Sequence, residues 1–179
     1  KKRHDNGTER IAEALNYLDV SDEDIVVDVQ GDEPLIYPET IDTLVSNFKL
    51  SSFDIMLPYI EINDTNNVNI VKISTVGKKI IYMSRMDIPC PFSQDRKLKK
   101  HLSIIAFTVS ALRKYSHMKK SELEKIESIE LLRALESGLE IGTFQESKES
   151  FSVDVIEDYH RANRYMRDDK VYKRYRLVQ

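Results

Sequence analysis

Apolar residues follow two different spacings along the chain, and the spacing changes from one segment to the next. Consecutive or alternating apolar residues predict strands at 25–29, 53–60, 102–109 and 139–144. Apolar residues three and four positions apart predict helices that begin near Thr8, Pro38, Ala111, Ser121 and Asp158. Strands that alternate with helices are typical of α/β proteins. We therefore expect an α/β sheet that is mostly parallel.

A β-hairpin interrupts this alternation. Residues 69–75 and 79–83 are rich in β-branched residues and flank the turn Val76-Gly77-Lys78, which predicts an inserted pair of antiparallel strands. Prolines make the segment 84–91 irregular. The residues 95–100 are mostly charged and predict a loop.

The composition limits the class of protein. The 179 residues suit a single domain, 1–179. With 27 basic and 30 acidic residues the net charge is −3, which argues against a general nucleic-acid-binding protein. The single cysteine, Cys90, excludes an internal disulfide and suits a reducing compartment. We see neither a signal peptide nor the run of about 20 apolar residues that a membrane span needs, so we expect a cytoplasmic protein with no membrane or nucleic-acid partner.

The first residues show no pattern of a strand or helix. The chain begins Lys1-Lys2-Arg3-His4-Asp5, and no strand is predicted before Ile25. Because doubly wound α/β folds usually open on a strand, we expect that an N-terminal portion of the protein is missing from this sequence. A natural domain with a disordered basic leader is the alternative.

Two carboxylates follow the first predicted strand. The strand ends at Gln30-Gly31, and Asp32 and Glu33 come next, before Pro34. Open α/β sheets bind their ligands at the carboxyl ends of strands, so this turn suits a carboxylate that holds a metal and a phosphorylated ligand. Asp, Gly and Pro are also ordinary turn residues. The spacing alone leaves the two interpretations level.

Asp154 is a second candidate metal ligand. It closes a short apolar run, and Mg²⁺ in proteins binds one or two carboxylates together with phosphates and water. Asp154 and Glu157 also match a helix-capping pattern, and the residues alone favour that interpretation.

Other charged residues are candidates for ligand binding. Arg85 suits a two-pronged contact with a carboxylate or phosphate, although the residues alone favour a structural salt bridge. His101 suits anion binding, acid–base chemistry or a polar strand edge. In the predicted helix 121–138, Glu127 and Glu130 share one flank, so one of them has the position to face a cleft, although such residues are usually solvated.

Several blocks of the sequence match a known family. They are, in order, Asn6-Gly-Thr-Glu-Arg10, Val27-Asp-Val-Gln-Gly-Asp-Glu-Pro-Leu-Ile36, Ser84-Arg85 with Ile88-Pro89, His101-Leu102, Leu123-Glu-Lys-Ile-Glu-Ser-Ile-Glu-Leu-Leu-Arg133, and Val153-Asp154 with Glu157-Asp158. By these blocks the chain resembles the sugar-acid cytidylyltransferases from about Asn6 to about Met166. The Val-Gln-Gly-Asp-Glu-Pro block is specific, because the related acylneuraminate enzymes have a different loop there.

This resemblance implies a Rossmann-like nucleotidyltransferase fold and a reaction. The anomeric hydroxyl of a 3-deoxy sugar acid, Kdo or a similar sugar, would attack the α-phosphate of CTP. The products would be a CMP-sugar for lipopolysaccharide biosynthesis and pyrophosphate. The resemblance also implies Mg²⁺ as cofactor and a homodimer.

The resemblance assigns roles to particular residues. The catalytic and metal-binding residues would be Asp32 and Asp154. The residues in contact with the acidic sugar would be Gln30, Arg85, His101 and Glu130. Part of the nucleotide site would be formed by Gly7, Thr8 and Arg10.

Three departures from the family pattern concern the sugar and the activity. Ile105 stands where the family has Tyr, and Leu131 stands where it has Gln. A pocket without these hydrogen-bonding groups is expected to bind a hydroxyl-rich sugar less well or to prefer another sugar. The family's N-terminal strand and its Arg/Lys-bearing nucleotide loop are also absent from the sequence. The alternatives are a weak or inactive relative that serves as a binding or assembly subunit, and the same chemistry on a nine-carbon sugar acid.

Overall fold

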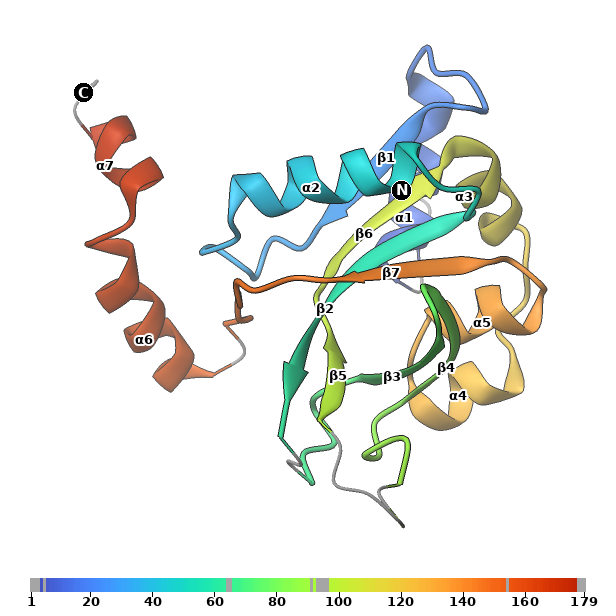
Figure 1. Ribbon diagram of the computed structural model, residues 1–179. Helices are drawn as coiled ribbons and strands as arrows, with labels where there is room; N and C mark the ends of the chain where they lie inside the picture. The colour runs from blue at the N-terminus through green and yellow to red at the C-terminus, as the bar shows by residue number, and fades with distance from the viewer. Residues whose placement is uncertain are drawn as a thin grey trace.

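The computed structural model describes residues 4, 6–63, 66–90, 92, 97–153 and 155–176, and Figure 1 shows how the helices and strands are arranged. The strands are β1 (Ile25–Val29), β2 (Ile55–Ile62), β3 (Lys72–Val76), β4 (Lys79–Ser84), β5 (Leu98–His101), β6 (Ile104–Thr108) and β7 (Ile141–Gln145). The helices are α1 (Gly7–Ala14), the short η1 (Leu15–Tyr17), α2 (Pro38–Lys49), α3 (Val109–Ser116), α4 (Glu122–Glu127), α5 (Leu131–Glu136), α6 (Ile156–Met166) and α7 (Lys170–Arg176). The predicted α/β class is confirmed.

The described strands form one mixed sheet of seven strands in the order β1-β6-β2-β5-β3-β4-β7. β2 and β7 pair in parallel, and the other pairings between described strands are antiparallel. β6 lies between β1 and β2 and runs antiparallel to both. The expectation of a mostly parallel sheet is therefore wrong, because it assumes that two strands joined by a helix pair directly.

The predicted hairpin is confirmed as β3 and β4, in which Ile73 lies opposite Met83. The predicted charged loop before His101 is wrong in its second half, because Leu98–His101 is strand β5 and pairs with β2. Charged side chains hide this strand in the sequence. The ammonium of Lys99 lies 4.6 Å from the ring centroid of Tyr59, a cation–π contact across the β2–β5 pair.

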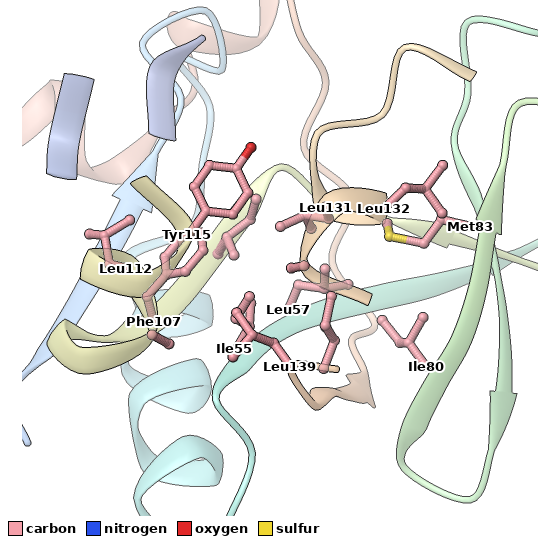
Figure 2. Close-up of a cluster of buried hydrophobic side chains, with 14 of the residues drawn as sticks. Ile55, Leu57, Ile80, Met83, Phe107, Leu112, Tyr115, Leu131, Leu132 and Leu139 are labelled. Carbon is pink, nitrogen blue, oxygen red and sulfur yellow. The ribbon is translucent and has the colours of Figure 1, made fainter. Parts of the chain in front are cut away.

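Helices cover both faces of the sheet. α2 packs on one face, where the buried residues are Leu44, Phe48, Met56, Ile104 and Ala106. α1, α3 and α5 pack on the other face, over a larger cluster that includes Ile55, Leu57, Phe107, Tyr115 and Leu132 (Figure 2). Neighbouring residues of β2 and β6 alternate between the two clusters, as the pleat of a strand requires.

The start of α1 differs from the prediction by two residues. Asn6, not Thr8, is the N-cap, and its side chain accepts a hydrogen bond from the backbone N–H of Glu9 at 2.8 Å. Both residue types are good caps, so the sequence does not choose between them. Thr8 instead lies inside the helix and is buried.

The predicted helix 121–138 is divided into α4 and α5. The break falls at Ser128, which has a positive φ of 52° and ends α4 in the left-handed region. The expectation that Glu127 and Glu130 share one helix flank is therefore wrong. The break instead places Glu130 immediately before α5.

The helices α6 and α7 stand to one side of the sheet (Figure 1, red). Ala162 is the one buried residue described in α6, and no described residue of α7 is buried. Among the described residues, no helix combines the length and the apolar character that crossing a bilayer requires.

A buried guanidinium joins three helices on the larger core. Arg133 of α5 is 1% exposed, and it donates to both carboxylate oxygens of Glu124 at 2.7 and 2.6 Å. It also donates to Glu9 of α1 at 3.1 Å and to the carbonyl of Met118 at 3.2 Å. Its carbon Cζ lies 4.7 Å from the ring centroid of Tyr115. Arg133 therefore holds α1 against α4 and α5.

We expect Arg133→Met to lower the free energy of unfolding by about 3–5 kcal/mol, because it leaves the buried Glu124 carboxylate unpaired. Urea denaturation measures this change. Lys125→Met is the matched control, since Lys125 forms an exposed pair with Glu122 and its loss should cost less than about 1 kcal/mol. Equal effects of the two substitutions would contradict a structural role for the Arg133 network.

Candidate active site

Two hydrogen bonds of Gln30 stabilise the turn after β1. The side-chain amide of Gln30 donates to the buried carboxylate of Asp28 at 2.9 Å, and the backbone N–H of Glu33 donates to the carbonyl of Gln30 at 3.2 Å. Burial raises the pKa of Asp28, and the charge of Asp32 adds to the increase. The contact with Asp28 fixes the direction of the Gln30 amide.

The same turn is tied to the segment before α6. Ser150 donates a hydrogen bond to the buried carboxylate of Glu33, and the backbone N–H of Val153 donates to the carbonyl of Asp32 at 2.8 Å. Asp154 lies outside the described residues. Val153, the residue before Asp154, is nevertheless hydrogen-bonded to the backbone of Asp32.

Two joined hollows open beside this turn. The smaller one has a volume of about 250 Å³ and is lined by residues that include Gln30, Asp32, Arg85, His101, Ile105, Glu130 and Leu131. The larger one has a volume of about 660 Å³, and its lining includes Glu33, Asn69, Lys100, Ser150 and Asp158. The two hollows share Val71, Arg85, His101, Ser103 and Ser152. The structure thus brings together Asp32 and all four residues expected to contact the sugar acid.

The guanidinium of Arg85 is engaged by backbone carbonyls. Its Nε donates to Glu127 at 2.7 Å, and its two terminal nitrogens donate to Val68 at 3.0 Å and to Ser128 at 3.1 Å. Ser128 has a left-handed backbone conformation, and its carbonyl accepts a hydrogen bond from this guanidinium. These partners are backbone groups, so the contacts differ from the salt bridge that was weighed for Arg85, and the carboxylate clamp stays a prediction.

Two charged side chains hold the backbone of Arg85. Its N–H donates to the Glu127 carboxylate at 2.9 Å, and the same carboxylate accepts from Ser84 at 2.7 Å. Its carbonyl accepts from the ammonium of Lys72, a fully buried residue that also lies 3.1 Å from the Asp87 carboxylate. The rim of both hollows around Arg85 is therefore rigidly connected.

His101 is a neutral imidazole in this site. Burial lowers its pKa to about 4, and the nearby charges of Lys100 and Arg85 also lower it. Its Nδ1 lies 3.0 Å from the carbonyl oxygen of Leu102. Since a carbonyl only accepts, Nδ1 carries the proton, and Nε2 is left as a hydrogen-bond acceptor. Of the three expectations for His101, anion binding by an imidazolium is therefore disfavoured.

Glu130 brings another carboxyl group to the smaller hollow. Burial raises its pKa, and the charge of Asp28 raises it further. The nearby hydroxyl of Thr8 acts in the opposite direction and lowers the pKa of Glu130, so the first turn of α1 lies near this carboxyl group. Gly7 and Arg10, the other two residues expected on the nucleotide side, are exposed on α1 and line neither hollow.

Apolar side chains form one wall of the smaller hollow. Ile105 lies opposite Asp28 in the register of β1 and β6, and Leu131 lies in the first turn of α5. Val71, Met83 and Ile129 complete this wall. The two positions that depart from the family pattern thus belong to the candidate site.

The metal site formed by two carboxylates stays a prediction. Within the described residues, no group of three or more His, Cys, Asp or Glu side chains is arranged to hold a metal ion. The predicted pair includes Asp154, which is outside this set. Carboxylate oxygens are suitable ligands for Mg²⁺, so Asp32 and Asp154 fit this ion by their chemistry.

Several residues of the site were not singled out from the sequence for their roles. Asp28 orients Gln30, Glu33 binds Ser150, and Lys72 holds the rim. A charged residue inside an apolar strand was the available signal for Asp28. No comparable signal marks Lys72, since most of its partners are backbone carbonyls, which any residue type supplies.

Comparison with known proteins gives a consistent result. A family model described as cytidylyltransferase matches residues 1–141. The 3-deoxy-manno-octulosonate cytidylyltransferase of a Nitratiruptor species is 34% identical over 177 residues, which cover 90% of this chain and 71% of that protein. The enzyme with the same description from Thermodesulfovibrio yellowstonii is 36% identical over 178 residues, which cover 90% of this chain and 70% of that protein.

A solved structure supports the same assignment. The CMP:2-keto-3-deoxy-manno-octonic acid synthetase complexed with CTP matches with a TM-score of 0.86 and 27% sequence identity. The match covers 92% of this chain and 69% of that one. This likeness confirms the Rossmann-like nucleotidyltransferase fold, and with the sequence matches it shows that the chain belongs to the cytidylyltransferase family.

Proposed function

We propose that this protein transfers a cytidylyl group from CTP to a 3-deoxy sugar acid, Kdo or a closely similar sugar. The observation that carries the proposal is the convergence of Gln30, Asp32, His101 and Glu130 on one hollow, although they come from three distant segments. The curated relatives named above carry this activity in their names.

The reaction exchanges one phosphorus–oxygen bond for another. The anomeric oxygen of the sugar bonds to the α-phosphorus of CTP, and the bond from that phosphorus to the β-phosphate breaks. Pyrophosphate leaves, and the hydroxyl proton is released. Such chemistry depends mainly on positioning and on stabilisation of phosphate charge.

Mg²⁺ is the cofactor we propose, with Asp32 and Asp154 as its ligands. When bound, the ion would neutralise phosphate charge and orient the reacting groups. The bond between Val153 and the carbonyl of Asp32 supports this pairing, because it fixes the chain next to Asp154 beside the turn that carries Asp32.

The remaining roles follow from hydrogen-bonding capacity. His101 offers an acceptor at Nε2, and Gln30 offers a carbonyl oxygen while its amide is held by Asp28, so both suit sugar hydroxyl groups. Glu130 is a further acceptor for a hydroxyl group. Thr8, with Gly7 and Arg10 in the same helical turn, is proposed for the nucleotide side.

The identity of the sugar depends on the apolar wall. Ile105 and Leu131 offer no hydrogen bond, which keeps two alternatives in view: a nine-carbon sugar acid, and a non-catalytic binding or assembly subunit. Pyrophosphate release with CTP, Mg²⁺ and a panel of sugar acids separates them. Release with one sugar identifies the substrate, whereas no release with any of them would contradict the enzymatic proposal.

The oligomeric state, the cellular location and the pathway of the enzyme are also proposals. A homodimer is supported by the exposed tyrosines of α6 and α7, such as Tyr159, Tyr165 and Tyr175, which are 53%, 59% and 73% exposed. Aromatic residues are enriched in the buried parts of protein interfaces. The single Cys90 supports a cytoplasmic location, and the proposed product supports a role in lipopolysaccharide biosynthesis.

We expect Asp32→Asn to lower kcat/KM for pyrophosphate release by more than about 100-fold, because it removes a charge from the proposed metal and phosphate site. The urea midpoint should change little, since Asp32 is exposed. Asp42→Asn on the exposed side of α2 is the matched control and should leave the rate unchanged. A normal rate in Asp32→Asn would contradict the role of this residue.

We expect the imidazole of His101 to stay neutral until the pH falls towards 4, because burial lowers its pKa to about 4. The KM for the sugar should therefore be independent of this group from about pH 8 to about 5.5 and rise as the pH approaches 4. NMR titration of the ring, assigned with His101→Asn, measures the midpoint directly. A midpoint near the ordinary value of about 6.5 would contradict the neutral acceptor role.

A further inference from the structure

The joined hollows contain few positive charges for an acidic ligand. Among the described residues that line them, Arg85 and Lys100 are the two lysine or arginine side chains. A sugar acid carries a carboxylate, and such a group binds most strongly to a charged hydrogen-bond donor. The contacts of the two cations indicate which of them is available.

Arg85 is poorly placed to bind the carboxylate with its usual two-pronged contact. Three of its five N–H groups already donate to the carbonyls of Val68, Glu127 and Ser128. Turning the guanidinium towards a ligand would remove the donors of these carbonyls and loosen the rim. Arg85 is therefore better described as a positioning residue, which adds a positive potential without giving up its contacts.

His101 cannot replace Arg85 as the cation that binds the sugar carboxylate. Burial holds this side chain neutral above a pKa of about 4, and its Nδ1 proton is directed to the carbonyl of Leu102. Lys100 is the adjacent residue of β5, and its charge acts on the His101 ring. The Lys100 ammonium is therefore close enough to the His101 imidazole to affect its pKa.

Lys100 has an exchangeable partner. Its side chain is 19% exposed and lines the larger hollow, and its ammonium lies 2.9 Å from the Glu149 carboxylate. Glu149 is 50% exposed, so its carboxylate can return to water when another anion takes its place. We propose that Lys100 binds the carboxylate of the sugar acid and that Glu149 competes with the substrate for this ammonium.

The position agrees with the chemistry of the substrate. This inference rests on the proposed function, in which the carboxyl group of a 2-keto sugar acid is attached to the anomeric carbon. The carboxylate must then lie next to the reacting hydroxyl. The hollows meet at Arg85, His101, Ser103 and Ser152, with Asp32 on the smaller side and Lys100 on the larger side. The inference places the sugar at this junction, with Asp32 on one side and Lys100 on the other.

Steady-state kinetics of the complete gene product test the assignment. Lys100→Met should raise the KM for the sugar acid by about 10- to 100-fold and leave the KM for CTP within about twofold. Glu149→Gln should lower the sugar KM by a few-fold, because the competing carboxylate is gone. Lys97→Met is the matched control, since it removes the same charge from an exposed residue near the start of β5 and should change neither constant.

A substrate analogue tests the charge itself. The wild-type protein should prefer the sugar acid over its carboxamide, and Lys100→Met should lose that preference, which a general loss of structure would not produce. An unchanged preference, or a sugar KM unaffected in Lys100→Met, would overturn the inference while leaving the proposed function intact.

Calorimetric titration with Kdo in the presence of Mg²⁺ and CTP distinguishes failure of the Lys100 inference from failure of the proposed function. If the wild-type protein binds Kdo but releases no pyrophosphate, and Lys100→Met abolishes the binding, the inference stands and the proposed function fails. If the wild-type protein neither binds a sugar acid of the panel nor releases pyrophosphate, both fail.

Discussion

The guanidinium of Arg85 is held by three backbone carbonyls, and the shape of the candidate site depends on this interaction. These carbonyls belong to the segment before β3 and to the break between α4 and α5. Buried backbone polar groups need partners, and here one side chain supplies several of them. The Arg85 guanidinium thus ties the segment before β3 to the break between α4 and α5, and the hydrogen bond from Ser84 to Glu127 supports the same junction.

The same interaction explains two features that otherwise look unfavourable. Ser128 adopts a left-handed backbone conformation, which costs a non-glycine residue of the order of 1 kcal/mol. Its carbonyl gains a charged donor in return. Lys72 is fully buried, yet its ammonium is surrounded by the carbonyls of Asn67, Ile70 and Arg85 and by the Asp87 carboxylate. Together these contacts make a rigid rim around a neutral His101.

A rigid rim favours catalysis by positioning. Transfer of a nucleotidyl group requires the sugar hydroxyl, the α-phosphorus and the leaving group to be aligned, and each mobile contact in the site would weaken that alignment. Arg133 extends the rigid region from α5 to α1, so the segment proposed for the nucleotide and the residues proposed for the sugar are mechanically linked. The cost of burying Arg133 and Lys72 is offset by their ion pairs with Glu124, Glu9 and Asp87.

Local patterns in the sequence predicted much of this arrangement. The strand before Gln30, the hairpin around Gly77 and the α/β class could all be inferred from periodicity and turn chemistry. The antiparallel placement of β6 could not, because pairing partners depend on the whole sheet. Strand β5 was missed because its lysines look like loop residues. The break at Ser128 was missed because Arg85, which donates to the Ser128 carbonyl, is distant in the sequence.

The candidate site was predictable to a different degree. The family resemblance named residues that the structure brings to one hollow, but it could not indicate that the Arg85 guanidinium is occupied or that His101 is neutral. Those properties arise from burial and from partners such as Leu102, which only the folded chain brings into place. Asp154 and its proposed partnership with Asp32 stay a prediction.

The most direct test is a crystal structure of the complete protein with CTP and a bound 3-deoxy sugar acid. The account predicts the sugar at the junction of the two hollows, its carboxylate within about 3 Å of the Lys100 ammonium, and Arg85 still bound to its three carbonyls. A sugar carboxylate clamped by a rotated Arg85, with Lys100 still paired to Glu149, would contradict it.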